Sequence, residues 1–370
     1  MDGSLIPFRG VPARCSHPLN DLAGAPDDAR PMTFAYPWGD DRSSLMATLH
    51  HRAAALIEQE GYPADHLVVV GLQHRGTPPI FLSHGSTATV GPLGPSSVAY
   101  AASLAKQITA TCAALLVRRN RLDMETTLAE WMPELPDWTR TIRLRHLVHH
   151  TAGMPTDEQI DAMIPADGDR TTTAILQALN RLPALAACPG SQYVYSNAGY
   201  VCLAVAVERA AGQPLTAFAH AHVFEPLGMI GSRYWPGPGS KPPGAMPLPK
   251  PHPAPLSLGD GGLWTTATDL MRWNQALDAD ELGISELLHT AGTLDNGTAL
   301  DYAWGLGIRT HAGQRLYRHG GGWPGIRAQL IRIPDQRSGL TVIALTDDTD
   351  QTTRLANKLL DTLVLPAKTS

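Results

Sequence analysis

A single lysine interrupts a long uncharged stretch of this chain, and this stretch constrains the fold more than any other feature. From residue 85 to residue 117, Lys106 is the only charged residue, and it lies among Ala, Leu and Ile. Burying a lone ammonium is costly unless a partner or the loss of a proton compensates for it. Burial also lowers the pKa of lysine, which makes lysine a usable base near neutral pH. The stretch therefore predicts a core helix, from about residue 103 to residue 119, that carries one functional amine.

Ser103 lies three residues before this lysine, so its hydroxyl projects from the same face of the predicted helix. The position is also close to the helix N-terminus, where backbone N–H groups favour developing negative charge. A nucleophilic serine beside a lysine base is one interpretation. The alternative is a serine that caps the helix and a lysine whose ammonium reaches the surface.

Two further motifs follow in the chain. Tyr195 and Asn197 lie in PGSQYVYSNAGY, a turn-rich stretch before a helical pattern. A tyrosine can relay a proton, and an asparagine amide can orient a substrate. In RHGGGWPG, His319 ends a strand-like run and precedes three glycines, which would let a substrate approach the backbone and offer N–H groups to an oxyanion. The alternatives are a packed aromatic with an N-cap asparagine, and an ordinary glycine turn.

The order of elements predicts an α+β fold. It consists of an antiparallel sheet formed from N- and C-terminal segments, flanked by helices, with an inserted, mainly helical lobe. Helices are expected at 45–60, 103–119, 144–150, 171–182, 198–211, 214–223, 266–277 and 352–363, and strands at 66–72, 80–83, 302–310, 316–319, 326–333 and 340–346.

The predicted domain organisation has two parts. Residues 1–44 are an irregular, Pro- and Gly-rich extension, and residues 45–370 form the catalytic domain. Within that domain, about 45–105 and 260–370 form an α/β lobe and about 106–259 the helical lobe. Nine prolines between residues 236 and 255 exclude a helix or central strand there and predict a segment at the rim of a pocket.

Composition excludes several classes of partner. The net charge of -5 provides no basic field for nucleic acid or anionic lipid. The N-terminus lacks the pattern of a secretory signal, so a soluble cytoplasmic protein is expected. Cys112 and Cys202 lie in apolar helical runs and are expected to be buried, reduced thiols. The oligomeric state is left open.

With these motifs in place, the sequence resembles the serine β-lactamase and penicillin-binding-protein superfamily, and within it the class C-like branch of esterases, D-aminopeptidases, carboxypeptidases and transesterases. The resemblance runs from about residue 45 to residue 363. Three framework phrases support it in family order: LRHLVHHTAGMP, PLGM and GGLWTTATDLMRW.

The resemblance implies a role for each matching residue. Ser103 would be the acylated nucleophile, Lys106 its base, and Tyr195 the proton shuttle to the leaving group. Asn197, His319 and Gly321 would contact the substrate, the last two as part of the third motif. The backbone N–H groups of Ser103 and Gly322 would form the oxyanion hole.

Two departures from the family pattern narrow the expected substrate. His319 stands where lactamases carry a lysine, and this replacement weakens the fixed positive charge that recognises a substrate carboxylate. Hydrolysis of β-lactams is therefore less favoured. Asp347 falls where relatives often carry asparagine, and an acid there would suit an amine-bearing substrate. An unchanged preference between amine-bearing and neutral substrates in Asp347→Asn would contradict this idea.

A metal is not expected, and neither is a cofactor. His146, His149 and His150 lie within one segment, but HExxH is absent and the sequence provides no carboxylate or cysteine ligands to complete a set. The function expected is a serine hydrolase acting on an ester or amide of a small molecule or short peptide. The alternatives are an acyltransferase or cyclising enzyme with the same residues, and a penicillin-binding-like sensor without turnover.

Overall fold

The computed structural model describes residues 42–87, 91–165, 169–248 and 253–364. The predicted extension over 1–44 therefore lies almost entirely outside the described residues, as does Cys15. Ser43–Ser370 form one compact unit. The division of this unit into two lobes remains a prediction.

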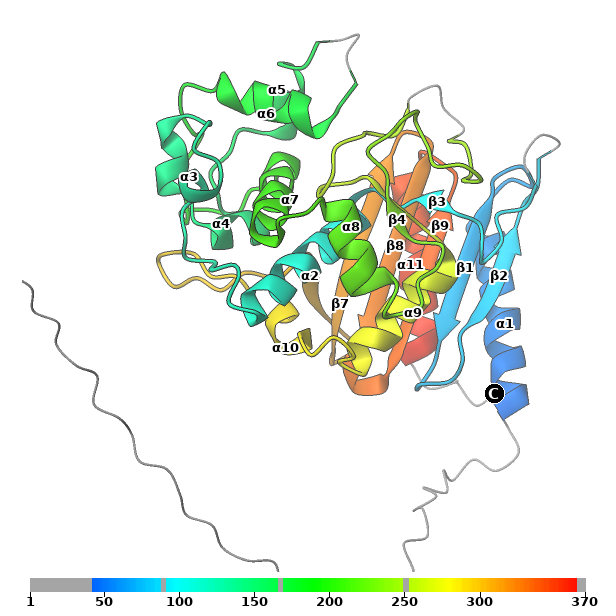
Figure 1. Ribbon diagram of the computed structural model, residues 1–370. Helices are drawn as coiled ribbons and strands as arrows, with labels where there is room; N and C mark the ends of the chain where they lie inside the picture. Colours follow the sequence, from blue (N-terminus) through cyan, green and yellow to red (C-terminus); the bar gives the residue numbers. More distant parts are fainter. Residues whose placement is uncertain (1–41, 88–90, 166–168, 249–252, 365–370) are drawn as a thin grey trace, which may run out of the picture. The chain divides into compact units, whose positions relative to one another are not determined.

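An antiparallel sheet of six strands organises this unit (Figure 1). Its first two strands come from the N-terminal part of the chain and its other four from the C-terminal part, as predicted. In spatial order the strands are β2 (Ile80–His84), β1 (Val68–Gln73), β9 (Ser338–Ala344), β8 (Ile326–Ile333), β7 (Gln314–Trp323) and β6 (Gly307–His311). The N-terminal hairpin pairs with β9, so the two ends of the described chain close one sheet.

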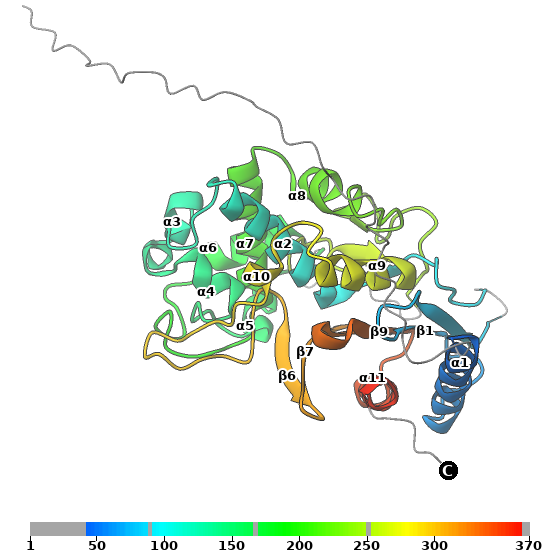
Figure 2. The same cartoon turned by 90° about the horizontal axis from the view of Figure 1, so that it is seen from below.

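The alternation of side chains along these strands creates two apolar faces. Val68 and Val70 of β1 pack with α1 (Arg42–Gln59) and α11 (Thr349–Val364), whereas Val69 belongs to a second core on the opposite face. That opposite face is covered by α9 (Ala267–Asp278) and by the helical part of the chain (Figure 2). The sheet is therefore a two-sided layer, and each residue of a strand belongs to one definite side.

Helices between the two sheet segments form the rest of the unit. The helix predicted around Lys106 is α2 (Ala105–Arg118), preceded by the one-turn helix η1 (Ala102–Leu104), and it packs against α7 (Asn197–Ala211). The other helices here are α3 (Leu128–Trp131), α4 (Leu144–Val148), α5 (Asp157–Asp161), α6 (Thr172–Asn180), α8 (Leu215–Ala219) and α10 (Ser285–Leu288). A small sheet joins β3 (Ala99–Tyr100), β5 (Leu263–Thr265) and β4 (Arg233–Tyr234).

Two predicted strand boundaries are wrong. The strand expected at 302–310 begins only at Gly307, because Ala303 N–H bonds to the carbonyl of Leu306 in a turn that contains Gly305 with a φ of 72°. The strand expected at 316–319 continues through all three glycines to Trp323, paired with β8 throughout. The alternative of a glycine turn at this place is therefore also wrong.

Among the helices of the described residues, none combines the length and the apolar character needed to cross a membrane.

Candidate active site

The turn between β3 and α2 presents Ser103. Ala102, the preceding residue, has a φ of 47°, in the left-handed region that costs an L-residue about 1–2 kcal/mol. Ser103 is partly exposed, while Lys106, one turn later, is fully buried. The strained turn thus places the Ser103 hydroxyl toward solvent, next to the buried Lys106 amine. Backbone strain of this kind is common at functional sites.

The Lys106 amine has three oxygen partners in the structure. Its Nζ lies 3.1 Å from Ser103 Oγ, 2.6 Å from Asn197 Oδ1 and 2.9 Å from the carbonyl oxygen of Asp260. An ammonium has three N–H donors, so all of them are satisfied. A neutral amine has two N–H donors and one lone pair. The amide and carbonyl oxygens can only accept, so they take the two donors and leave the lone pair for the serine hydroxyl.

Burial lowers the pKa of Lys106 to about 8, against the opposing effects of Asp260 and Asp157. About one-tenth of the molecules then carry the neutral amine at pH 7. The prediction of a buried lysine is confirmed by the structure. The alternative of a lysine whose ammonium reaches the surface is wrong, because α7 and the segment around Asp260 cover it.

Three charged residues that were not singled out in the sequence surround this amine. The Asp157 carboxylate accepts from Asn197, through the backbone N–H at 2.9 Å and through Nδ2 at 2.7 Å. Arg170 donates to Asp260 Oδ2 at 2.7 Å, and both side chains are largely buried. Burial raises the pKa of the Asp260 carboxyl, but Arg170 and Lys106 outweigh it, so this pKa lies below its usual range.

Tyr195 lies next to the serine and the lysine. Its ring centroid is 4.8 Å from Lys106 Nζ, and its phenol hydrogen-bonds to the Ser103 side chain. Burial raises the pKa of this phenol well above its usual range, so the hydroxyl stays protonated at neutral pH. A protonated phenol bonded to the nucleophile can pass a proton to a leaving group.

His150 stacks on Tyr195, with ring centroids 4.3 Å apart. Its Nδ1 accepts the backbone N–H of Ser196 at 3.1 Å, so in the neutral ring the proton lies on Nε2. Its carbonyl accepts the N–H of Val194. These two bonds hold the segment that carries Tyr195. His146 and His149 instead contact backbone atoms of Arg143 and Arg145. Within the described residues no group of His, Cys, Asp and Glu has the arrangement of a metal site.

His319 lies on the same face of the sheet as Ser103, with its ring 6.2 Å from that of Tyr195. Its Nδ1 is 2.6 Å from the Gly320 carbonyl, so Nδ1 carries the proton, and Nε2 accepts from the Tyr302 hydroxyl at 3.1 Å. Burial and the nearby Lys106 lower the pKa of His319 to about 4. The imidazole is therefore neutral at physiological pH and supplies no fixed positive charge.

The glycines after His319 allow β7 to approach the nucleophile turn. A Cβ on Gly321 would lie 2.4 Å from the carbonyl oxygen of Ala101, so only glycine fits without movement. Gly320 and Gly322 face the other side of the sheet, toward Gln329 and Arg327 of β8. The predicted roles of Gly321 toward substrate and of the Gly322 N–H as an oxyanion donor remain predictions.

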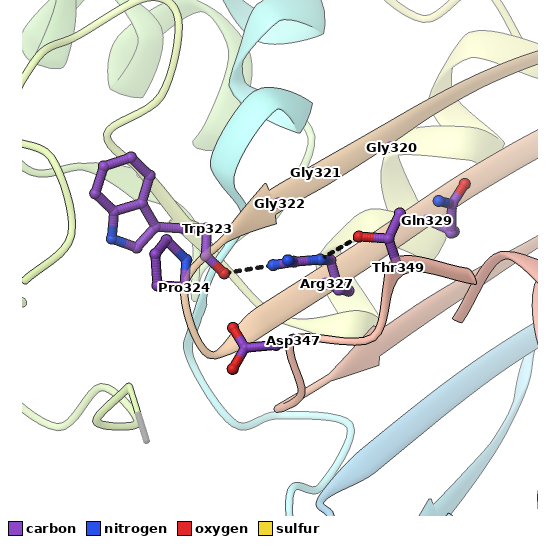
Figure 3. Close-up of a pocket in the computed structure, with 9 residues that line it drawn as sticks. All are labelled: Gly320, Gly321, Gly322, Trp323, Pro324, Arg327, Gln329, Asp347 and Thr349. Carbon is purple, nitrogen blue, oxygen red and sulfur yellow. Dashed lines mark hydrogen bonds between the residues drawn. The ribbon is translucent and has the colours of Figure 1, made fainter. Parts of the chain in front are cut away.

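A cavity of about 450 Å³ lies along this glycine strand (Figure 3). Gln329 of its lining contacts Thr353, and Arg327 contacts Thr349 at the start of α11, so the cavity lies mainly on the α11 face of the sheet. Ser103 and Lys106 lie on the opposite face and do not line it. The complete lining is Gly320, Gly321, Gly322, Trp323, Pro324, Arg327, Gln329, Asp347 and Thr349.

Asp347 belongs to this cavity. One of its carboxylate oxygens accepts the backbone N–H of Gly325 at 2.8 Å, which fixes the turn between β7 and β8. The structure thus brings together Ser103, Lys106, Tyr195, Asn197 and His319, whereas Asp347 lines a cavity that lies mainly on the other face of the sheet. Its role in selecting an amine-bearing substrate remains a prediction.

The remaining sequence predictions concern the cysteines and the proline-rich segment. Cys112 and Cys202 are buried free thiols, as predicted, and Cys188 is an exposed free thiol. Trp323, at the end of β7, donates its indole N–H to the carbonyl of Pro253, so the proline-rich segment reaches the end of the glycine strand.

Sequence reasoning missed Asp157, Arg170 and Asp260. Asp260 had a usable signal, because it lies in the stretch GDGG directly before a framework phrase. Asp157 follows the TAGMP turn, where an acid is unremarkable. Their proximity to Lys106 depends on contacts across 51 residues or more of sequence, which local patterns do not report.

The chain matches the family model described as Beta-lactamase over residues 63–364. It is 28% identical over 289 residues to penicillin-binding protein 4* of Bacillus subtilis (strain 168), a match that covers 68% of this chain and 62% of that protein. It is 27% identical over 276 residues to a D-aminopeptidase of Brucella anthropi, covering 70% of this chain and 51% of that protein. The chain therefore spans less than two thirds of the length of these relatives.

The fold is similar to that of solved structures. The D-amino acid amidase from Ochrobactrum anthropi SV3, complexed with D-phenylalanine, superposes with a TM-score of 0.71 at 20% identity. The superposition covers 86% of this chain and 100% of that one. At this identity the likeness shows a shared fold, and it agrees with the antiparallel sheet and flanking helices described above.

Proposed function

The chain belongs to the beta-lactamase family, and from this premise we propose that it is a serine hydrolase that is acylated on Ser103. The match over most of the chain confirms the family resemblance predicted from the motifs, and the fold is the one which that resemblance implies. The observation that carries the proposal is the Lys106 amine, buried 3.1 Å from Ser103 Oγ with its two other partners both acceptors.

The first half of the proposed reaction acylates the serine. The neutral Lys106 amine takes the hydroxyl proton as Ser103 Oγ adds to the carbonyl carbon of an ester or amide. The backbone N–H groups of Ser103 and Gly322 stabilise the resulting oxyanion. The tetrahedral intermediate then expels the alcohol or amine. Tyr195 donates a proton to this leaving group and recovers one from the Lys106 ammonium.

The second half releases the acyl group. A water molecule gives up a proton to the neutral amine and adds to the acyl carbon, and collapse of the second intermediate breaks the bond to Oγ. The serine oxygen regains a proton, and a carboxylic acid leaves. The partial exposure of Ser103 supports hydrolysis, because water reaches the acyl carbon from the solvent side.

The substrate we propose is an amide or a short peptide, D-configured ones included. The similar D-aminopeptidase suggests this class by its name. The strand geometry supports an extended substrate: β6 pairs with β7 only as far as Arg318, so beyond it β7 has no strand partner on that side among the described residues. A peptide can add its backbone to such an edge. Neutral His319 disfavours substrates that depend on a carboxylate, β-lactams among them.

Intact-protein mass spectrometry tests this function. The wild-type chain, Ser103→Ala and the matched control Ser191→Ala are mixed with p-nitrophenyl esters, D-amino acid amides and a chromogenic cephalosporin. We expect a transient adduct on the wild type and the control, and no adduct on Ser103→Ala. An adduct that persists indicates a sensor without turnover. Absence of any wild-type adduct, even with a fluorophosphonate, would contradict every covalent mechanism on Ser103.

A further inference from the structure

The side chain of Asn197 lies between a base and an acid. Its Oδ1 is 2.6 Å from Lys106 Nζ, and its Nδ2 is 2.7 Å from Asp157 Oδ2. The other carboxylate oxygen of Asp157 accepts the backbone N–H of Asn197 at 2.9 Å. Asp157 therefore holds both the backbone and the side chain of the residue that contacts the lysine.

These contacts permit one orientation of the amide. A carboxylate only accepts hydrogen bonds, so the NH₂ group of Asn197 must face Asp157 and the oxygen must face Lys106. The reversed amide would set oxygen against carboxylate and NH₂ against the lysine amine. From this geometry we infer that Asp157 is a positioning residue that orients the Asn197 amide and so keeps the lone pair of Lys106 directed at Ser103. The inference rests on the proposed function of Lys106 as the base.

The element that carries Asp157 also supports the second partner of the lysine. One turn along α5, Asp161 binds Arg170 at 3.0 Å, and Arg170 binds the side chain of Asp260. The carbonyl oxygen of Asp260 is the other acceptor for Lys106. The short helix α5 is therefore connected to both fixed acceptors, one through Asn197 and one through Arg170.

The charges around Lys106 determine how a change at position 157 alters the base. Asp260 and Asp157 raise its pKa and Arg170 lowers it, while His150 and His319 are neutral rings and Tyr195 and Tyr200 present aromatic faces. Replacing Asp157 with asparagine removes one of the two negative charges. The pKa of Lys106 then falls below about 8, and the fraction of neutral amine at pH 7 rises.

Asp157→Asn also removes the constraint on the Asn197 amide. The substituted side chain carries an NH₂ group in place of one carboxylate oxygen, and this group would face the NH₂ group of Asn197. Rotation of the Asn197 amide relieves this conflict. Its NH₂ then donates to the lone pair of Lys106, which no longer points at Ser103. The expected signature is unusual: more of the lysine is neutral, yet catalysis is slower. A change that merely loosened the structure would not lower the titration point of the lysine.

The test compares the full-length wild type, Asp157→Asn and the matched control Glu158→Gln, an exposed neighbour on α5. Steady-state kinetics on a D-amino acid amide should show kcat reduced about 10- to 100-fold in Asp157→Asn, with its acid limb at lower pH. The control should match wild type. The chain has five lysines, so ¹³C-lysine labelling resolves the titration of Lys106, assigned with Lys106→Arg. That titration should move to lower pH in Asp157→Asn alone.

Two results would overturn the inference. One is a kcat for Asp157→Asn within twofold of wild type, and the other is an unchanged titration of Lys106, whatever the kcat. Failure of the proposed function looks different, because the wild type would then form no adduct on Ser103. The NMR titration needs no turnover and still decides whether Asp157 controls Lys106. If Asp157→Asn does not fold, Asp157→Ser, which keeps one acceptor oxygen, should fold and show the same shift in titration.

Discussion

Replacing Gly321 with alanine tests how β7 positions the nucleophile. A Cβ at this position would lie 2.4 Å from the carbonyl oxygen of Ala101, whereas ordinary contacts begin at 3.4 Å. The strand or the turn must therefore move by about 1 Å, and a displacement of that size can cost about 100-fold in rate. Gly321 has no left-handed φ, so backbone conformation does not oppose the change. Overpacking of this kind destabilises the fold by about 1–3 kcal/mol.

The matched control is Gly94→Ala, which lies outside the site. Gly94 also lacks a left-handed φ, and its Cβ would lie 3.8 Å from Ser97 Oγ, an ordinary contact. Urea denaturation of both variants should show a loss confined to Gly321→Ala. The rate of Ser103 acylation by a small fluorophosphonate, followed by mass spectrometry, should fall about 100-fold in Gly321→Ala. Wild-type stability together with an acylation rate within threefold of wild type would refute the packing argument.

Two further results follow from buried charges. Because protonated Lys106 cannot act as a base, kcat/KM of the wild type should rise about tenfold per pH unit below pH 8 and level off above it; a flat profile from pH 6 to pH 9 would exclude this lysine as the base. The ion pair of Arg332 with Asp278, at 2.7 Å and with side chains 2% and 5% exposed, predicts that Arg332→Met loses about 3–5 kcal/mol in urea denaturation, because a buried acid remains unpaired. A loss below about 1 kcal/mol would contradict that estimate.

The pattern of charged residues and the short runs of Val, Ile and Leu were sufficient to predict most of the fold. The helix around Lys106 was predictable because, apart from Lys106, the chain carries no charge from residue 85 up to residue 117, one residue before α2 ends at Arg118. The strands β1, β8 and β9 were predictable because they are rich in Val, Ile and Leu between turns. The short helices α3, α5 and α10 were not, since one turn of helix is too short to show a period of 3.6 residues.

The site was predictable only where motifs mark it. Ser103, Lys106, Tyr195 and Asn197 belong to local patterns, and the structure brings them together. The side of the sheet on which a cavity lies cannot be predicted from the sequence in the same way, because a shift of one residue in strand register exchanges the two faces. That parity directs Gly321 toward the nucleophile turn, whereas Gly320 and Gly322 face Gln329 and Arg327 on the side where most of the cavity lies.

The distribution of charge around Lys106 explains how a buried amine retains enough basicity to act. Protonated Lys106 and Arg170 are accompanied by Asp157, Asp260 and Asp161, the other partner of Arg170, so the cluster carries one negative charge with the lysine charged and two with the lysine neutral. Asp157 and Asp260 therefore favour the protonated form of Lys106 against the effect of burial. Transfer of the Ser103 proton to the Lys106 amine then moves one negative charge from the cluster to the oxyanion. Since His319 is neutral, it supplies no cation to that oxyanion, and the proposed mechanism assigns its stabilisation to the backbone N–H groups of Ser103 and Gly322. A substrate carboxylate would then gain no attraction from the cluster, which supports the proposed preference for an amide without a carboxylate over a β-lactam.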